Sequence, residues 1–131
     1  MSTVVAIDAG GTRVRVLAVT SQGTEVFRAL GGPCNWATMP REEFRRHLDD
    51  ALYGCPRPDA VAICAAGVLT PQDQDELRAW LAEWFPTAVV GAWADYCGAV
   101  AAMRARSTCC VVAGTGSVVA SRVGGLFVKS G

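Results

Sequence analysis

The sequence predicts an α/β fold with a mixed sheet, built in the order β-β-β-α-β-α-β-α and followed by a separate meander of three strands. Two observations support this prediction. The chain opens with short apolar runs divided by glycine-containing turns, and runs of helical periodicity then alternate with wholly apolar runs. Such alternation of helices and strands is typical of a sheet that becomes parallel. With 131 residues, 51% of them hydrophobic, the chain can bury a core of its own.

The opening residues are expected to form an antiparallel meander. Val4–Asp8 reads as a short buried strand, and Val14–Thr20 as a second strand with apolar residues at alternate positions. The tight turn between them is Asp8-Ala-Gly-Gly-Thr12. A further turn at residues 21–24 leads into the third strand, Glu25–Leu30.

Helices then alternate with strands. Apolar residues at helical spacing predict one helix from Pro40 to the residue before Gly54. Ala60–Ala65 is apolar without alternation, which indicates a strand covered on both faces. A second helix extends from Thr70, which has the signature of a capping box, to Pro86. Residues 88–91 are expected to form a third buried strand, and residues 96–104 a last helix.

The chain changes character after Ser107, because only strands and glycine turns follow. The opening Val4–Thr12 and the later Val111–Ser117 each read as a buried strand that ends in a glycine–threonine turn, which indicates an internal repeat. We therefore expect two domains, residues 1–106 and residues 107–131, of which the second is the start of a truncated lobe. Its three strands are expected at Thr108–Ala113, Val118–Val123 and Leu126–Lys129.

Composition excludes several classes of partner. Twelve basic and twelve acidic residues give a net charge of zero, so no nucleic acid and no anionic membrane is expected as a partner. The N-terminal residues lack the pattern of a signal peptide, and no apolar run reaches the length of about 18 residues that spans a bilayer. A cytoplasmic location is therefore expected. No pair among the cysteines has C-x-x-C spacing, which favours reduced thiols: Cys34, Cys55, Cys64, Cys97, Cys109 and Cys110.

The turn after the first strand has the chemistry of a phosphate loop. Gly10 and Gly11 let the backbone approach an anion, and the Thr12 hydroxyl can donate a further hydrogen bond. Asp8 is placed to hold Mg²⁺ through water. An ordinary hairpin turn is the alternative. A second candidate loop of this kind consists of Gly114, Thr115, Gly116 and Ser117.

Three other residues are candidates for a site. Asp95 follows a predicted buried strand at the start of a helix, hence at the carboxyl edge of the sheet where ligands bind, although it could serve only as a helix N-cap. Asn35 is a candidate polar contact or a turn former. Trp36 could stack on a sugar, but packing in the core is favoured. His47 is expected on the solvated face of its helix.

No Walker or Rossmann motif is present, and both glycine loops connect strand to strand. Four segments together resemble the N-acetylglucosamine kinase and BadF/BadG/BcrA/BcrD ATPase family, within the sugar kinase, actin and heat-shock ATPase superfamily. They are Val5–Arg13, Gly32–Asn35, Ala94–Ala102 and Val112–Ser117.

The resemblance implies two ribonuclease-H-like (actin-like ATPase) lobes that bind ATP and a sugar in the cleft between them. It implies that Thr12 and Thr115 belong to the two phosphate loops, that Asn35 binds sugar hydroxyls, and that Asp95 contacts the acceptor and is the catalytic base. The function expected is that of an ATP- and Mg²⁺-dependent kinase for an amino sugar.

Two alternatives remain open at this point. One is a BadF-type ATPase that activates a partner enzyme, although no cysteine matches the iron–sulfur ligands of such proteins. The other is a non-catalytic half, because a partial second lobe exposes unpaired strand edges. Such a half would form a homodimer or pair with a separately encoded second lobe.

Overall fold

The computed structural model describes residues 2–103, 108–113, 117–123 and 126–130, and beyond residue 103 it describes the backbone and the side chain of Ala120. The elements follow the predicted order, with small shifts at their ends. They are β1 (Thr3–Ala9), β2 (Val14–Thr20), β3 (Glu25–Gly31), α1 (Arg41–Leu52), β4 (Ala60–Ala65), α2 (Pro71–Trp84), β5 (Val89–Ala94), α3 (Asp95–Ala102), β6 (Thr108–Ala113), β7 (Ser117–Val123) and β8 (Leu126–Ser130).

The first sheet has five strands in the order β3-β2-β1-β4-β5. Pairing of β1 with β2 and of β2 with β3 is antiparallel, whereas β1 with β4 and β4 with β5 are parallel. The predicted opening meander and the change to parallel pairing are therefore confirmed. Since β1, β4 and β5 point the same way, their carboxyl ends meet at one edge of the sheet.

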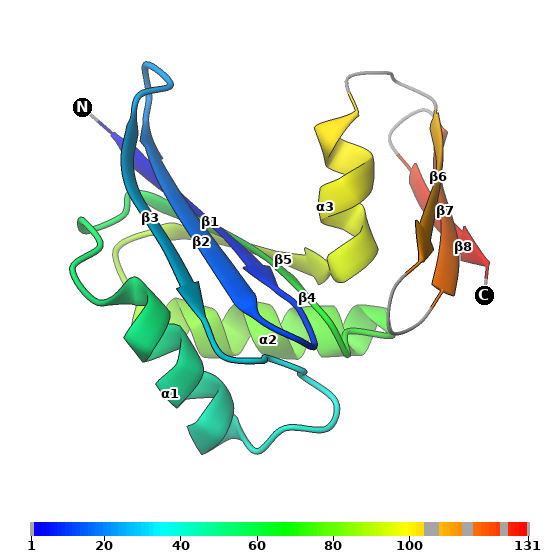
Figure 1. Ribbon diagram of the computed structural model, residues 1–131, viewed down its shortest axis with the longest axis horizontal. Coiled ribbons are helices and arrows are strands. Elements are labelled where there is room, and N and C mark those ends of the chain that lie inside the picture. Colours follow the sequence, from blue (N-terminus) through cyan, green and yellow to red (C-terminus); the bar gives the residue numbers. More distant parts are fainter. Residues whose placement is uncertain (1, 104–107, 114–116, 124–125, 131) are drawn as a thin grey trace.

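The two faces of this sheet are covered unequally. Helix α1 packs beneath β2 and β3, and α2 beneath β5, so that together they close one face (Figure 1). Alternate residues of β2, namely Val14, Val16 and Ala18, are buried on that side, as their spacing predicts. Among the described helices, α3 is the one that lies on the other face, where it contacts β1, β4 and β5. This second face is called the open face below.

The start of α2 shows why the chain becomes helical there. The Thr70 hydroxyl oxygen accepts a hydrogen bond from the backbone N–H of Asp73 at 3.1 Å. The Asp73 carboxylate in return accepts one from the backbone N–H of Thr70 at 2.9 Å. This reciprocal pair is the predicted capping box, and Pro71 occupies the first helical position.

A second, antiparallel sheet has the order β6-β7-β8. Helix α3 stands between the two sheets and contacts both β6 and β7 (Figure 1). The predicted domain boundary at residue 106 lies outside the described residues, so the division at that point stays a prediction.

Two details differ from the sequence prediction. Strand β5 continues to Ala94 and lies at the edge of the sheet, so Val89 is 77% exposed rather than buried. His47 is half-buried rather than solvated, because its ring lies against Gly32 and Pro33 in the loop that leaves β3. Its Nδ1 donates a hydrogen bond to the carbonyl of Pro33.

Among the described helices, none has both the length and the apolar character required to span a bilayer.

Phe44 of α1, on the face of the sheet that α1 and α2 close, gives a test of the core. Phe44 is fully buried and its ring packs edge-on against Trp36 at 5.3 Å and Trp80 at 5.5 Å between centroids. Truncation leaves a cavity, so we expect Phe44→Ala to lower the free energy of unfolding by about 3–5 kcal/mol in urea denaturation. Tyr53→Ala is the matched control, because Tyr53 is 89% exposed. Equal losses from the two substitutions would contradict this packing.

Candidate functional site

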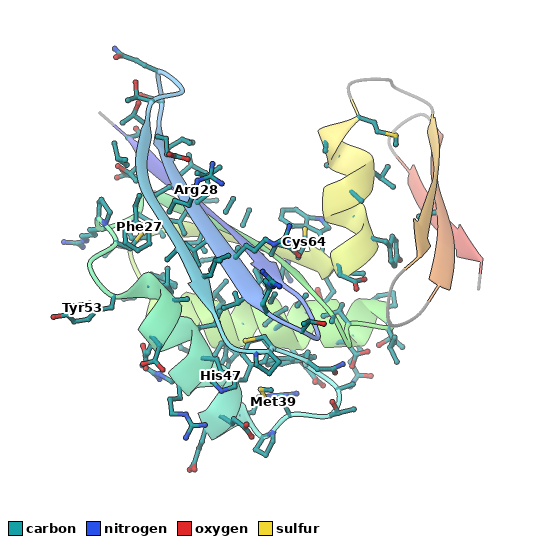
Figure 2. The ribbon with its side chains drawn as sticks, viewed as in Figure 1. Phe27, Arg28, Met39, His47, Tyr53 and Cys64 are labelled. Atoms are coloured by element: carbon teal, nitrogen blue, oxygen red, sulfur yellow. The ribbon has the colours of Figure 1, made fainter. Side chains whose placement is uncertain are left out.

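The open face of the five-stranded sheet carries a groove of about 1120 Å³. Its walls come from β1, β2, β3 and β4 and from the first turns of α3. Figure 2 shows Cys64 of β4 on the side of the sheet that faces α3. Clefts at the carboxyl edge of an α/β sheet are the usual place for a small ligand, so this groove is the candidate site.

The register of the strands aligns the side chains of the groove. Arg15 pairs with Asp8 across β2 and β1, and Asp8 pairs with Cys64 across β1 and β4. The same row continues to Leu30 on β3 and Trp93 on β5. Because directly paired residues project to the same face, these five side chains form one row across the open face. Asp8 is thus held at the centre of the row.

The two predicted carboxylates meet in this groove. Burial raises the pKa of Asp8 above its ordinary value, the guanidinium of Arg15 lowers it, and the nearby carboxylate of Asp95 raises it again. Asp8 and Asp95 both line the groove. The structure therefore brings together an aspartate from the end of β1 and one that directly follows β5.

Asp95 is the first residue of α3, whereas the N-cap is Ala94. One carboxylate oxygen of Asp95 accepts a hydrogen bond from the backbone N–H of Tyr96 at 2.8 Å. The interpretation of Asp95 as only an N-cap is therefore wrong, since the cap position belongs to its neighbour. Asp95 is exposed toward the groove and can reach a ligand there.

The glycine turn contributes to the groove at one position. Gly10 lines it, and its backbone N–H donates to the carbonyl of Arg13 at 3.0 Å. A Cβ at residue 10 would lie 2.9 Å from that carbonyl oxygen, which explains the glycine. Gly11 and Thr12 are exposed at the tip of the turn and lie outside the groove lining.

Asn35 lies near the same edge of the sheet but does not line the groove. Its side-chain oxygen accepts hydrogen bonds from the backbone N–H groups of Ala37 at 3.0 Å and Thr38 at 3.2 Å. A Cβ at Gly67 would collide with this oxygen, and Gly67 also has a φ of +85°. Asn35 is therefore a turn former whose side-chain oxygen is engaged by its own loop.

Trp36 packs in the core, as the sequence favours. Only 3% of it is exposed, with its ring edge-on to Phe44 and Trp80. It is consequently not available to stack on a ligand in the groove.

Most residues that line the groove were not predicted as site residues, and Arg13, Arg15 and Tyr96 are among them. Within the described part of the chain, no ion pair or side-chain hydrogen bond of Arg13 or Arg15 occurs. The signal for Arg15 was visible in the sequence. It is a charge at the second position of a strand whose alternate residues are apolar, shortly after a phosphate-loop pattern.

The second glycine loop cannot be placed in the same way. Gly114, Thr115 and Gly116 lie outside the described residues. Ser117 begins β7 and pairs with Ala113, and its side chain lies outside the description. The role of this loop stays a prediction.

The carboxylates of Asp8 and Asp95 could hold a Mg²⁺ ion whose other ligands are water and phosphate oxygens. Within the described residues, no three His, Cys, Asp or Glu side chains form a metal-binding group. Mg²⁺ typically keeps several waters and takes only one or two protein carboxylates together with substrate phosphates. Asp8 and Asp95 supply two carboxylates, which is the number that such a site takes from the protein. The remaining ligands of the ion would be water and phosphate oxygens.

No protein-family model and no curated protein matches the sequence. Solved structures do share its fold. A proposed N-acetylglucosamine kinase from Porphyromonas gingivalis has 20% identity and a TM-score of 0.70 over 98% of this chain and 46% of its own. A proposed N-acetylmannosamine kinase from Listeria monocytogenes has 17% identity and a TM-score of 0.72 over 96% and 49%. A proposed sugar kinase from Cytophaga hutchinsonii has 18% identity and a TM-score of 0.69 over 99% and 50%.

The chain thus spans about half the length of the solved structures that it matches. At these identities the likeness is one of fold: a mixed α/β sheet of five strands with three helices, as in proposed sugar kinases.

The charges around Asp8 give a test of the site geometry. Arg15→Gln removes a positive charge that favours the ionised carboxylate, so we expect the pKa of Asp8 to rise further. Asp95→Asn removes a like charge, so we expect the pKa of Asp8 to fall. Carbon-13 carboxyl NMR titration measures both shifts.

Arg78→Gln is the control for these titrations, because Arg78 pairs with Asp75 on the surface of α2 and does not line the groove. The assigned geometry fails if Arg15→Gln and Arg78→Gln leave the Asp8 titration equally unchanged.

Proposed function

We propose that this chain supplies one ribonuclease-H-like lobe of an ATP-dependent sugar kinase, which transfers a phosphoryl group from ATP to a hydroxyl of an amino sugar. One observation supports this proposal above the others. Asp8 and Asp95 share a groove at the carboxyl edge of a fold found in proposed N-acetylglucosamine and N-acetylmannosamine kinases. The sugar named for those proteins sets the substrate class proposed here.

Asp95 is the proposed catalytic base. It lies at the start of α3, exposed to the groove, and a carboxylate in that position can accept the proton of an attacking hydroxyl. Its hydrogen bond from the Tyr96 N–H fixes one carboxylate oxygen. The other oxygen is left to face the acceptor.

Asp8 and the glycine turn form the proposed phosphate side of the groove. Asp8 would hold Mg²⁺ through water, and the metal would neutralise charge on the phosphates. The N–H of Gly10 is already bonded to the carbonyl of Arg13, so the exposed tip of the turn, Gly11 and Thr12, would offer a backbone N–H and a hydroxyl to phosphates that extend past the groove lining. Arg15 stands beside Asp8 in the register and supplies a positive charge against them.

Tyr96 is the proposed contact for the sugar ring. Trp36 is buried in the core, whereas Tyr96 lines the groove next to the proposed base. An aromatic ring packs well against the apolar face of a pyranose. Asn35 remains a weaker candidate, because only its amide NH₂ is left for a sugar hydroxyl.

The rest of the nucleotide site is proposed to come from a second lobe. Residues 107–131 would begin that lobe, and Thr115 would belong to its phosphate loop. The remainder would be contributed by further residues of the same protein, by a separately encoded chain or by a second copy in a homodimer. The chain covers about half the length of the matched structures, which supports the proposal that a second lobe completes the site.

Asp95→Asn tests the base assignment in the full protein. We expect kcat to fall by about 10²–10⁴-fold, because an amide cannot accept the proton, while the affinity for ATP is retained. Coupled measurement of ADP release with N-acetylglucosamine gives kcat, and calorimetry gives the ATP affinity.

Asp50→Asn is the matched control, since Asp50 is exposed on α1 and does not line the groove. Turnover by Asp95→Asn that equals turnover by Asp50→Asn would refute the assignment of the base.

A further inference from the structure

A second cavity, of about 380 Å³, lies at the opposite edge of the five-stranded sheet from the groove. It is enclosed by the last turn of α1, by residues 55–58 ahead of β4 and by residues 84–88 ahead of β5. Parallel strands begin at this edge, so the cavity is called the amino-edge pocket. Its volume falls in the range of small-molecule sites, which is roughly 300–1,000 Å³.

The walls of the amino-edge pocket are held in place by local bonds. The backbone N–H of Cys55 donates to the carbonyl of Leu52 at 2.9 Å, and that of Ala88 donates to Phe85 at 3.1 Å. Arg57 links the two loops, because its guanidinium donates to the Thr87 hydroxyl at 2.9 Å. A pocket fixed in this way loses little entropy when a ligand binds.

The lining is mainly apolar and aromatic. The rings of Trp84 and Phe85 are stacked, with centroids 5.1 Å apart and 21° between their planes. Val5 and Leu52 complete the apolar surface, and the thiol of Cys55 adds no charge, because burial raises its pKa. Such a surface favours a flat or branched hydrocarbon body.

The lining of the pocket carries two charged side chains, Asp49 and Arg57, and they differ in whether an oppositely charged group pairs with them. Asp49 already has a partner, since its carboxylate lies 3.8 Å from Arg45. Arg57 forms no ion pair within the described residues, and its hydrogen-bond partner there is the neutral hydroxyl of Thr87. The planar guanidinium therefore keeps donors for an anion, and carboxylates are its natural bidentate partners.

We propose that the amino-edge pocket is a second ligand site that binds a small aromatic or branched aliphatic carboxylate, with the apolar body against Trp84 and Phe85 and the carboxylate on Arg57. The site is independent of the proposed kinase activity, because it shares no lining residue with the groove. Its ligand would therefore act on this protein as an effector and not as the phosphoryl acceptor.

Phenylacetate is the probe for this proposal, with isothermal titration calorimetry as the measurement. We expect saturable binding with one site per chain, and no saturable binding of phenethylamine, which has the same body and the opposite charge. Arg57→Gln should weaken the binding of phenylacetate by at least about tenfold, as expected for loss of a charged hydrogen bond. Leu52→Trp should abolish binding by filling the pocket.

Two variants locate the bound probe. Arg78→Gln removes an exposed arginine of α2, and Arg15→Gln removes one from the groove; neither should change the affinity for phenylacetate. The proposal is overturned by absence of saturable binding, by equal affinity in Arg57→Gln, by weaker binding in Arg15→Gln or by equal binding of phenethylamine. Circular dichroism of each variant checks that it is folded.

Discussion

The register between β1 and its two neighbours is the constraint on which the candidate site depends. Asp8 is aligned with Arg15 on one side and with Cys64 on the other, and the carboxyl end of β5 delivers Asp95 to the same groove. Side chains alternate between the faces of a strand, so a slip of one residue in β1 would turn Asp8 into the core and bring Ile7 or Ala9 to the groove. The apolar face of β1 against α1 and α2 opposes that slip.

Much of this architecture could be predicted from local sequence. The ends of β2 and β4 and the capping box of α2 were marked by alternation, by turn residues and by Thr70 with Asp73. The true end of β5 was not marked in this way. The strand was expected to stop at Gly91, yet it continues to Ala94, and the ring of Trp93 lies over Gly91 and occupies the space where a side chain would stand. That contact forms only in the folded sheet, so no local pattern reports it.

The site could be predicted in part, for a similar reason. Asp8 lies at the end of one strand and Asp95 directly follows another, and strand ends meet at one edge once the sheet is parallel, so their meeting was foreseeable. The role of Asn35 could not be predicted, because an asparagine in a loop can bind a ligand or its own backbone. Which of the two it binds here depends on the close approach of Gly67. The role of Arg15 depends on its pairing with Asp8 across two strands, and only the register of the folded sheet sets that pairing.

We thus propose different chemistry for the two edges of the sheet. At the carboxyl edge, Asp8 and Asp95 face a wide groove suited to phosphate, metal and sugar, and at the amino edge, Arg57 faces a small apolar pocket. We propose above all that Mg²⁺ and ATP bind at the carboxyl edge. Titration of the ¹⁵N-labelled protein with Mg²⁺ and ATP tests it most directly: amide shifts concentrated at residues 8–13 and 95–98 are predicted. Absence of shifts there at saturating nucleotide would contradict the account.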